Sequence, residues 1–220
     1  MSEVDTDTGV SEAEYDGDAD PDVDDDEVDP FDELPSWEDE YLETLARRLM
    51  YNYDLEKDYR VDGHGERFPL YGRMELTSQK HFLHPALSFA HHVSHEHLFV
   101  RRVDRAGTAD LERLVELGHA LADEWIEANE DHYCTEFTFG VVTSSIDDDV
   151  RAMVAGLDER TLLKLGYYGH YEVNLVVVAP EANDVVANDA ADVEQAFRTW
   201  DEIERTEPGL LQLISRRLQL

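Results

Sequence analysis

The sequence predicts a single α+β domain that follows an acidic N-terminal arm. Three observations predict it: amphipathic segments with apolar residues three and four positions apart, segments that alternate with period two, and one continuous apolar run. The strands group early in the chain and then alternate with helices, which favours one mixed or antiparallel sheet with packed helices. With 220 residues, 42% of them apolar, the chain can bury one sizeable core.

Residues 1–35 are expected to form a disordered acidic arm, and residues 36–220 the α+β domain. The first 40 residues hold nineteen acidic residues and no basic one, and their few apolar residues show no period. The arm is interpreted as a solvated extension, with docking on a basic protein partner as the alternative. Pro30 and Pro35 mark the exit from it.

A helix is predicted directly after the arm, with Ser36 as its N-cap and Asp39 in its first turn. Its apolar face of about five turns follows from helical spacing. The residues on that face are Trp37, Tyr41, Leu42, Leu45, Leu49 and Tyr53.

The next part of the chain predicts a three-stranded meander. Residues 68–76 alternate as a strand does, with Leu70, Gly72, Met74 and Leu76 on one face. Residues 82–103 fit two further strands, separated by a hairpin at Val93–His95.

Helices and strands alternate after the meander. A strongly amphipathic helix is predicted from Thr108 to near Asn129, and a strand from Tyr133 to Val141. The run Leu175–Ala179 predicts a central strand, from His170 to Ala179, that is covered on both faces. Helices are predicted over 147–157, 158–165, 192–205 and 209–219, the last being short and amphipathic.

The charge balance is strongly acidic: 52 Asp and Glu face 18 Lys and Arg, for a formal net charge of -34. Only Lys57, Lys80 and Lys164 are lysines. This acidic, lysine-poor composition resembles that of proteins from salt-in halophilic archaea. Such proteins tolerate dense carboxylates, because molar salt shortens the Debye length to roughly 3 Å and the carboxylates then repel one another only weakly. Direct binding of nucleic acid is disfavoured, since an acidic body repels phosphate.

A cytoplasmic location is expected. The N-terminus has neither the basic segment nor the apolar segment of a secretory signal. No run approaches the roughly 20 consecutive apolar residues that span a bilayer, so no membrane role is predicted. The single cysteine, Cys134, cannot form an internal disulfide and is interpreted as a buried structural residue. A protein partner could dock on the acidic arm or on the C-terminal helix, and the sequence leaves the oligomeric state open.

Six of the ten histidines lie between residues 81 and 97. Residues two apart on a strand share a face, so His95 and His97 could point together with His91 from a neighbouring strand and hold a divalent transition metal. The spacing matches no zinc-protease motif. The alternative is that these imidazoles pack on half-exposed strands, and no cofactor is predicted in that case.

Four glutamates fall within predicted strands, where carboxylates are less expected than on helices: Glu75, Glu96, Glu136 and Glu172. They are the candidates for a polar cleft, with solvent-facing positions as the alternative. No glycine-rich phosphate loop, no GxSxG and no paired CxxC occurs in the chain.

The segments YLETLARRLMYNYDLEKDY, FPLYGRMEL and HEHLFVRRV are similar to a family of uncharacterised archaeal and bacterial proteins, over approximately residues 37–180. That resemblance implies no catalytic residues. The element order also resembles restriction-like nucleases, but their Glu-x-Lys is Glu96, His97 and Leu98 here. A non-catalytic binding or interaction role is therefore predicted, with a metal-dependent hydrolase that uses the histidine cluster with Glu75 or Glu96 as the alternative.

Overall fold

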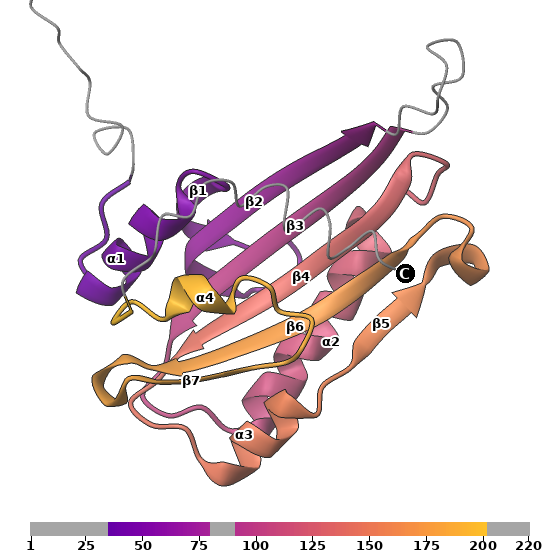
Figure 1. Ribbon diagram of the computed structural model, residues 1–220. Helices are drawn as coiled ribbons and strands as arrows, with labels where there is room; N and C mark the ends of the chain where they lie inside the picture. Colours follow the sequence, from indigo (N-terminus) through magenta and orange to yellow (C-terminus); the bar gives the residue numbers. More distant parts are fainter. Residues whose placement is uncertain (1–34, 80–90, 202–220) are drawn as a thin grey trace, which may run out of the picture.

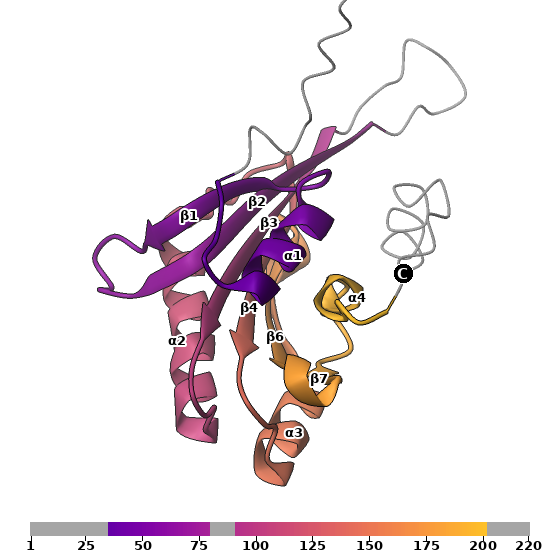
Figure 2. The same cartoon turned by 90° about the vertical axis from the view of Figure 1, so that its left-hand side faces the viewer.

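The computed structural model describes residues 35–79 and 91–201, which form an α+β fold (Figure 1). A seven-stranded mixed sheet has helices on both faces: α1 and α4 lie on one side, α2 and α3 on the other (Figure 2). Residues 1–34 of the predicted acidic arm, much of the predicted 82–92 strand and the predicted helix 209–219 lie outside the described residues.

The elements follow one another in the order helix, three strands, helix, and then alternating strands and helices. Their bounds are α1 Glu40–Leu49, β1 Asp54–Arg60, β2 Arg67–Gln79, β3 His91–Arg102, α2 Thr108–Trp125, β4 His132–Val142, α3 Asp148–Ala155, β5 Glu159–Leu162, β6 His170–Ala179, β7 Asp184–Ala187 and α4 Glu194–Phe197. Short 3-10 turns, η2 Leu163–Gly166 and η3 Pro180–Ala182, flank β6.

The strand order is β1-β2-β3-β4-β6-β5. Strand β7 also pairs with β6, along the same edge of β6 as β5 and farther along the strand. The meander β1-β2-β3 is antiparallel, whereas β3, β4 and β6 run parallel to one another. Parallel neighbours need a crossover, and α2 supplies it between β3 and β4. Register partners on β3, β4 and β6 therefore lie side by side across the middle of the sheet.

The first helix begins later than the sequence predicts. Asp39, not Ser36, is the N-cap, because its carboxylate accepts hydrogen bonds from the N–H groups of Tyr41 and Leu42. Trp37 precedes the helix, and its backbone N–H donates to Glu43 Oε2 at 2.9 Å. Tyr53 falls after the helix, yet its side chain still packs in the same core.

The meander differs from the predicted one in its members. Val93–His95 is not a hairpin, because β3 continues through it and pairs with β2 along its length. The first strand is β1, which the pattern does not reveal because its residues are largely exposed at the sheet edge.

Two predicted helices are also wrong. Residues 158–165 form β5 and η2, since Lys164 and Leu165 have positive φ values that an α-helix excludes. Only Glu194–Phe197 is helical within the described part of the predicted helix 192–205. The strand predicted over His170–Ala179 has those bounds as β6.

Each face of the sheet carries its own core. The α2 side buries a cluster centred on Phe99, Phe137, Phe139, Leu114 and Leu121. The opposite side buries residues of α1 and α4 against Leu98, Val100, Val142 and Val176. Gly140 permits this second contact, because a Cβ there would lie 2.6 Å from two ring carbons of Phe197.

Candidate functional site: a histidine-lined cavity

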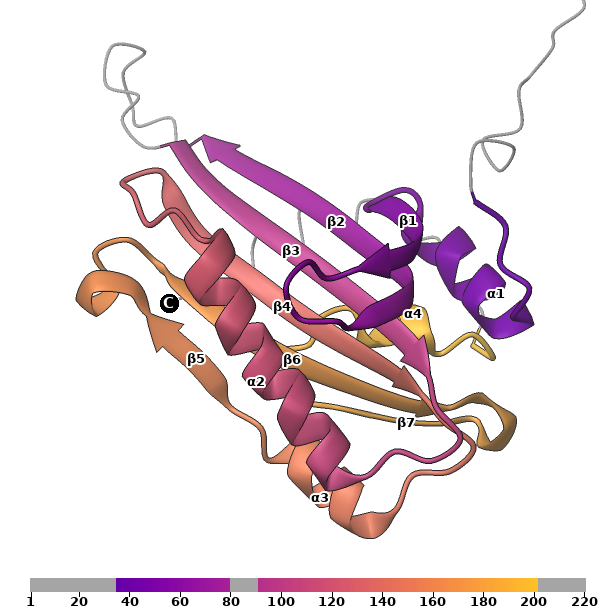
Figure 3. The ribbon, with the colours of Figure 1, turned by 180° about the vertical axis from the view of Figure 1, so that it is seen from behind.

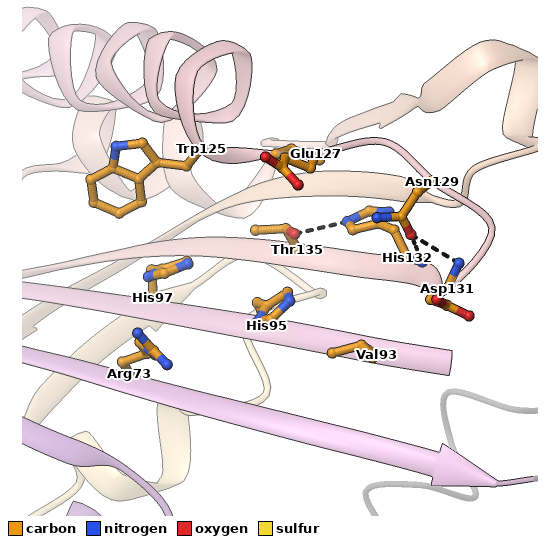
Figure 4. A pocket seen from close by; sticks show the side chains of 11 residues that line it. Arg73, Val93, His95, His97, Trp125, Glu127, Asn129, Asp131, His132 and Thr135 are labelled. Carbon is orange, nitrogen blue, oxygen red and sulfur yellow. Dashed lines mark hydrogen bonds between the residues drawn. The ribbon is translucent and has the colours of Figure 1, made fainter. Parts of the chain in front are cut away.

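A cavity of about 400 Å³ opens on the α2 side of the sheet. It lies where β3 and β4 begin and α2 ends, beneath the loop that joins α2 to β4 (Figures 3 and 4). Strands β2, β3 and β4 form its floor. Its lining is Arg73, Val93, His95, His97, Trp125, Ile126, Glu127, Asn129, Asp131, His132 and Thr135.

His97 is held rigidly in the floor. Its Nδ1 is 2.8 Å from the Tyr71 hydroxyl, and its ring stacks on Phe137 with centroids 5.3 Å apart. The ring also makes an edge-to-face contact with Trp125, with centroids 5.0 Å apart. Burial, together with the nearby His95 and Arg73, lowers the pKa of His97 to about 4. The imidazole is therefore neutral at pH 7.

His132 connects Thr135 to the chain after β5. Its Nδ1 lies 2.7 Å from the carbonyl oxygen of Tyr168, which can only accept, so Nδ1 carries the proton. Its Nε2 then accepts from the Thr135 hydroxyl at 2.9 Å. Burial lowers the pKa of His132, although the Tyr168 carbonyl opposes part of that shift. A hydroxyl, a neutral imidazole and a carbonyl thus form one relay at the cavity.

Charges of opposite sign lie on opposite walls of the cavity. Arg73 rises from the β2 side, while Glu127 and Asp131 come from the loop above β4 (Figure 4). Glu75 lies beside His95, with its Oε2 3.7 Å from Nδ1. Among the residues that the structure describes, Arg73 makes no hydrogen bond and no ion pair, although the chain has nearly three acidic residues for each basic one.

Three glutamates form a row on the opposite face of the sheet, here called the glutamate row: Glu96, Glu136 and Glu172. They are register partners on β3, β4 and β6. Glu96 and Glu136 are 8% and 6% exposed. Tyr53 donates to Glu96 Oε2 at 2.7 Å, and His170 Nε2 lies 3.3 Å from Glu172 Oε1.

The sequence-predicted site residues are thus divided between the two faces. Glu75 lies beside the cavity, with the sheet between it and the glutamate row. His95 and His97 line the cavity, whereas the side chain of His91 lies outside the described residues, as do His81 and His84. In the described part of the chain, no three His, Cys, Asp or Glu side chains are grouped so that they could hold a metal ion. A metal at His91, His95 and His97 stays a prediction.

Sequence reasoning missed Arg73, His132, Thr135 and the loop acids as members of one site. Periodicity gives the face on which each residue lies, but only the parallel pairing of β3 with β4 brings His95 beside Thr135. On the glutamate row's face, Met74 is opposite Glu96 and Leu98 is buried. The second-strand acid and the lysine that restriction-like nucleases require are therefore absent from these positions.

Comparison with known proteins gives a family but no function. No helix of the described residues is long and apolar enough to cross a membrane. Neither a curated protein nor a solved structure matches the chain. One family model matches residues 38–199, which is most of the chain. The chain therefore belongs to that family, the domain of unknown function DUF8052.

Proposed function

We propose that this domain binds a small zwitterion of the amino-acid type in the histidine-lined cavity. The observation that carries the proposal is Arg73, an exposed residue with a permanent positive charge and no carboxylate partner among the described residues, at a cavity of an otherwise acidic protein. An arginine fork binds a carboxylate with two parallel hydrogen bonds. The ligand's anionic group is assigned to it.

The other walls define the rest of the ligand. Glu127 and Asp131 would repel a second anionic group and attract an ammonium group. Val93, Trp125 and Ile126 offer apolar surface for a side chain. A volume of about 400 Å³ is within the range of small-molecule pockets.

Binding without catalysis is favoured by the histidines. His97 and His132 are neutral at pH 7, and each ring makes hydrogen bonds to protein atoms that fix its orientation. The two histidines therefore serve as walls of the cavity and as neutral polar contacts for the ligand. Arg73 is the cation that selects ligands with a carboxylate.

Thermal unfolding tests this proposal. Each of the twenty free amino acids is added to the full chain in molar potassium chloride, and the melting temperature is measured. At least one amino acid is expected to raise the melting temperature, and its decarboxylated amine is expected to have no effect. Glu127→Gln should weaken the amino acid's effect but should not abolish it. No shift with any of the twenty would overturn the proposal.

A second candidate function rests on the relay of Thr135, His132 and the Tyr168 carbonyl. A hydroxyl bonded to a base that a third group orients is the arrangement of nucleophilic hydrolases. The Thr135 hydroxyl would attack the ester carbonyl while His132 Nε2 takes its proton; the ester's alcohol or phenol would leave with that proton, and water would then hydrolyse the acyl-threonine. Hydrolysis of p-nitrophenyl acetate that is lost in Thr135→Val would support this function, and equal rates in both proteins would exclude it.

We further infer that the protein works in the cytoplasm of a cell that accumulates salt. The net charge of -34 and the three lysines support this inference. The binding experiments are therefore designed for high salt.

A further inference from the structure

The glutamate row occupies a part of the sheet that the described helices do not reach. On β4, Phe197 of α4 packs at Gly140, whereas Glu136 lies four residues earlier, about 13 Å away along the strand. Most core residues beneath α1 and α4 belong to the other half of this face, and Tyr53 and Met74 at the edge of that core border the glutamate row. The half with the glutamate row is nevertheless buried around Cys134, Glu136 and Asn174.

This half of the face combines negative charge with apolar surface. Three carboxylates from adjoining strands lie in one line, with Met74 and Cys134 beside them. Arg160 Nε is 3.6 Å from Glu172 Oε1, so the row with this arginine keeps an excess of carboxylates. Asn174 is 1% exposed, and its Nδ2 has no hydrogen-bond partner in the described part of the structure. A complementary segment would bring cations, apolar side chains and a hydrogen-bond acceptor.

The chain carries such a segment beyond residue 201. Asp201, the last of the described residues, lies on this side of the sheet, where its carbonyl accepts a hydrogen bond from Arg48 Nη2 at 2.6 Å. Residues 210–218 are apolar at helical spacing and include the adjacent Arg216 and Arg217. The eight residues from 202 to 209 can span up to about 26 Å, which is twice the distance along β4 from Gly140 to Glu136.

We propose that residues 209–219 dock as a helix on the half-face of the glutamate row, with Arg216 and Arg217 against its carboxylates. The segment closes the sheet on the side opposite the cavity. The segment that occupies the half-face belongs to the same chain. Docking by a second copy of the chain is a distinct outcome of the test.

The single cysteine makes the proposal directly testable. Cys134 lies on this half-face, and its Sγ is 3.9 Å from Glu136 Oε1. We would introduce one cysteine at Ser215 or, in a second variant, at Leu211 of the full chain, and oxidise each protein mildly. An intramolecular disulfide in either variant, at monomer mass, is the expected result. A disulfide-linked dimer would assign the surface to a second copy, and no disulfide in either variant would overturn the proposal.

Charge reversal provides an independent measurement. The rate at which Cys134 reacts with a thiol reagent is expected to rise on the order of tenfold in the double variant Arg216→Glu, Arg217→Glu, because the segment would undock. Arg205→Glu, which makes the same type of change in the connecting residues, is the control and should leave the rate unchanged. Circular dichroism verifies that each variant is folded. Equal rates in all three proteins would contradict docking through the arginines.

Discussion

Arg73 on β2 and His97 on β3 are register partners on the cavity side of the sheet, and the guanidinium helps to keep the imidazole uncharged. A positive charge beside a buried imidazole disfavours the protonated form. The same arginine that we assign to the ligand's carboxylate therefore adds to the effect of burial, which is the largest cause of the lowered pKa of His97.

Replacing Arg73 should consequently change the titration of His97. In Arg73→Gln the pKa of His97 should rise from about 4, because one of the charges that lower it is gone. It should stay below the ordinary value of 6.5, since burial is the largest cause. NMR titration of the imidazole resonances measures both values. An unchanged pKa of His97 would show that the two groups do not interact.

His97 should also make the fold sensitive to acid. Its pKa is lowered in the folded chain, so the unfolded chain binds the proton between pH 6.5 and about 4. Its contribution is complete above pH 6.5 and is lost as the pH falls towards 4. Between pH 6.5 and 5, His97→Gln should reduce the slope of the unfolding free energy, by at most about 1.4 kcal/mol per pH unit. Parallel curves for the two proteins in urea titrations would contradict the assigned shift.

Removal of the Thr135 hydroxyl should destabilise the relay. In Thr135→Val, Nε2 of the buried His132 loses its donor, which costs about 1–3 kcal/mol. Thr138 is a buried threonine of the same strand whose hydroxyl makes no hydrogen bond within the described residues. Thr138→Val is thus the matched control and should cost less. Equal losses in chemical denaturation would mean that the hydroxyl of Thr135 contributes nothing specific.

The contact between β4 and α4 predicts a coupled pair of substitutions. Gly140→Ala places a Cβ at 2.6 Å from the Phe197 ring and should cost about 1–3 kcal/mol by overpacking. Phe197→Leu, in the same chain, should relieve part of that cost. A double variant whose loss equals the sum of the two single losses would show that the residues do not touch.

Salt should stabilise the fold. The free energy of unfolding and the melting temperature are expected to rise as potassium chloride increases to molar concentration, because screening weakens repulsion among the carboxylates. Sucrose is the control, since it stabilises by exclusion and does not screen charge. If the melting temperature is the same in dilute buffer and in molar salt, the halophilic interpretation is wrong.

The sequence predicts the helices and strands better than it predicts which strands pair with one another. Alternation on β4 and β6 and the helical face of α2 are strong local patterns, so these elements are found with little error. The exposed edge strand β1 and the left-handed turn at Lys164 and Leu165 leave no such pattern. Glu96, Glu136 and Glu172 stand out as strand carboxylates, but only strand pairing shows that they form one row while Glu75 lies across the sheet.

The central claim, that Arg73 binds the carboxylate of a zwitterion, is tested most directly by isothermal titration calorimetry. The amino acid with the largest thermal shift would be titrated into the wild-type chain, Arg73→Gln and Arg60→Gln in molar potassium chloride. Arg60 of β1 is the control: like Arg73 it is exposed and makes no ion pair among the described residues, but it lies outside the cavity. We predict that the Kd rises at least about tenfold, ~1.4 kcal/mol, in Arg73→Gln alone. Equal affinity of all three proteins would contradict the account.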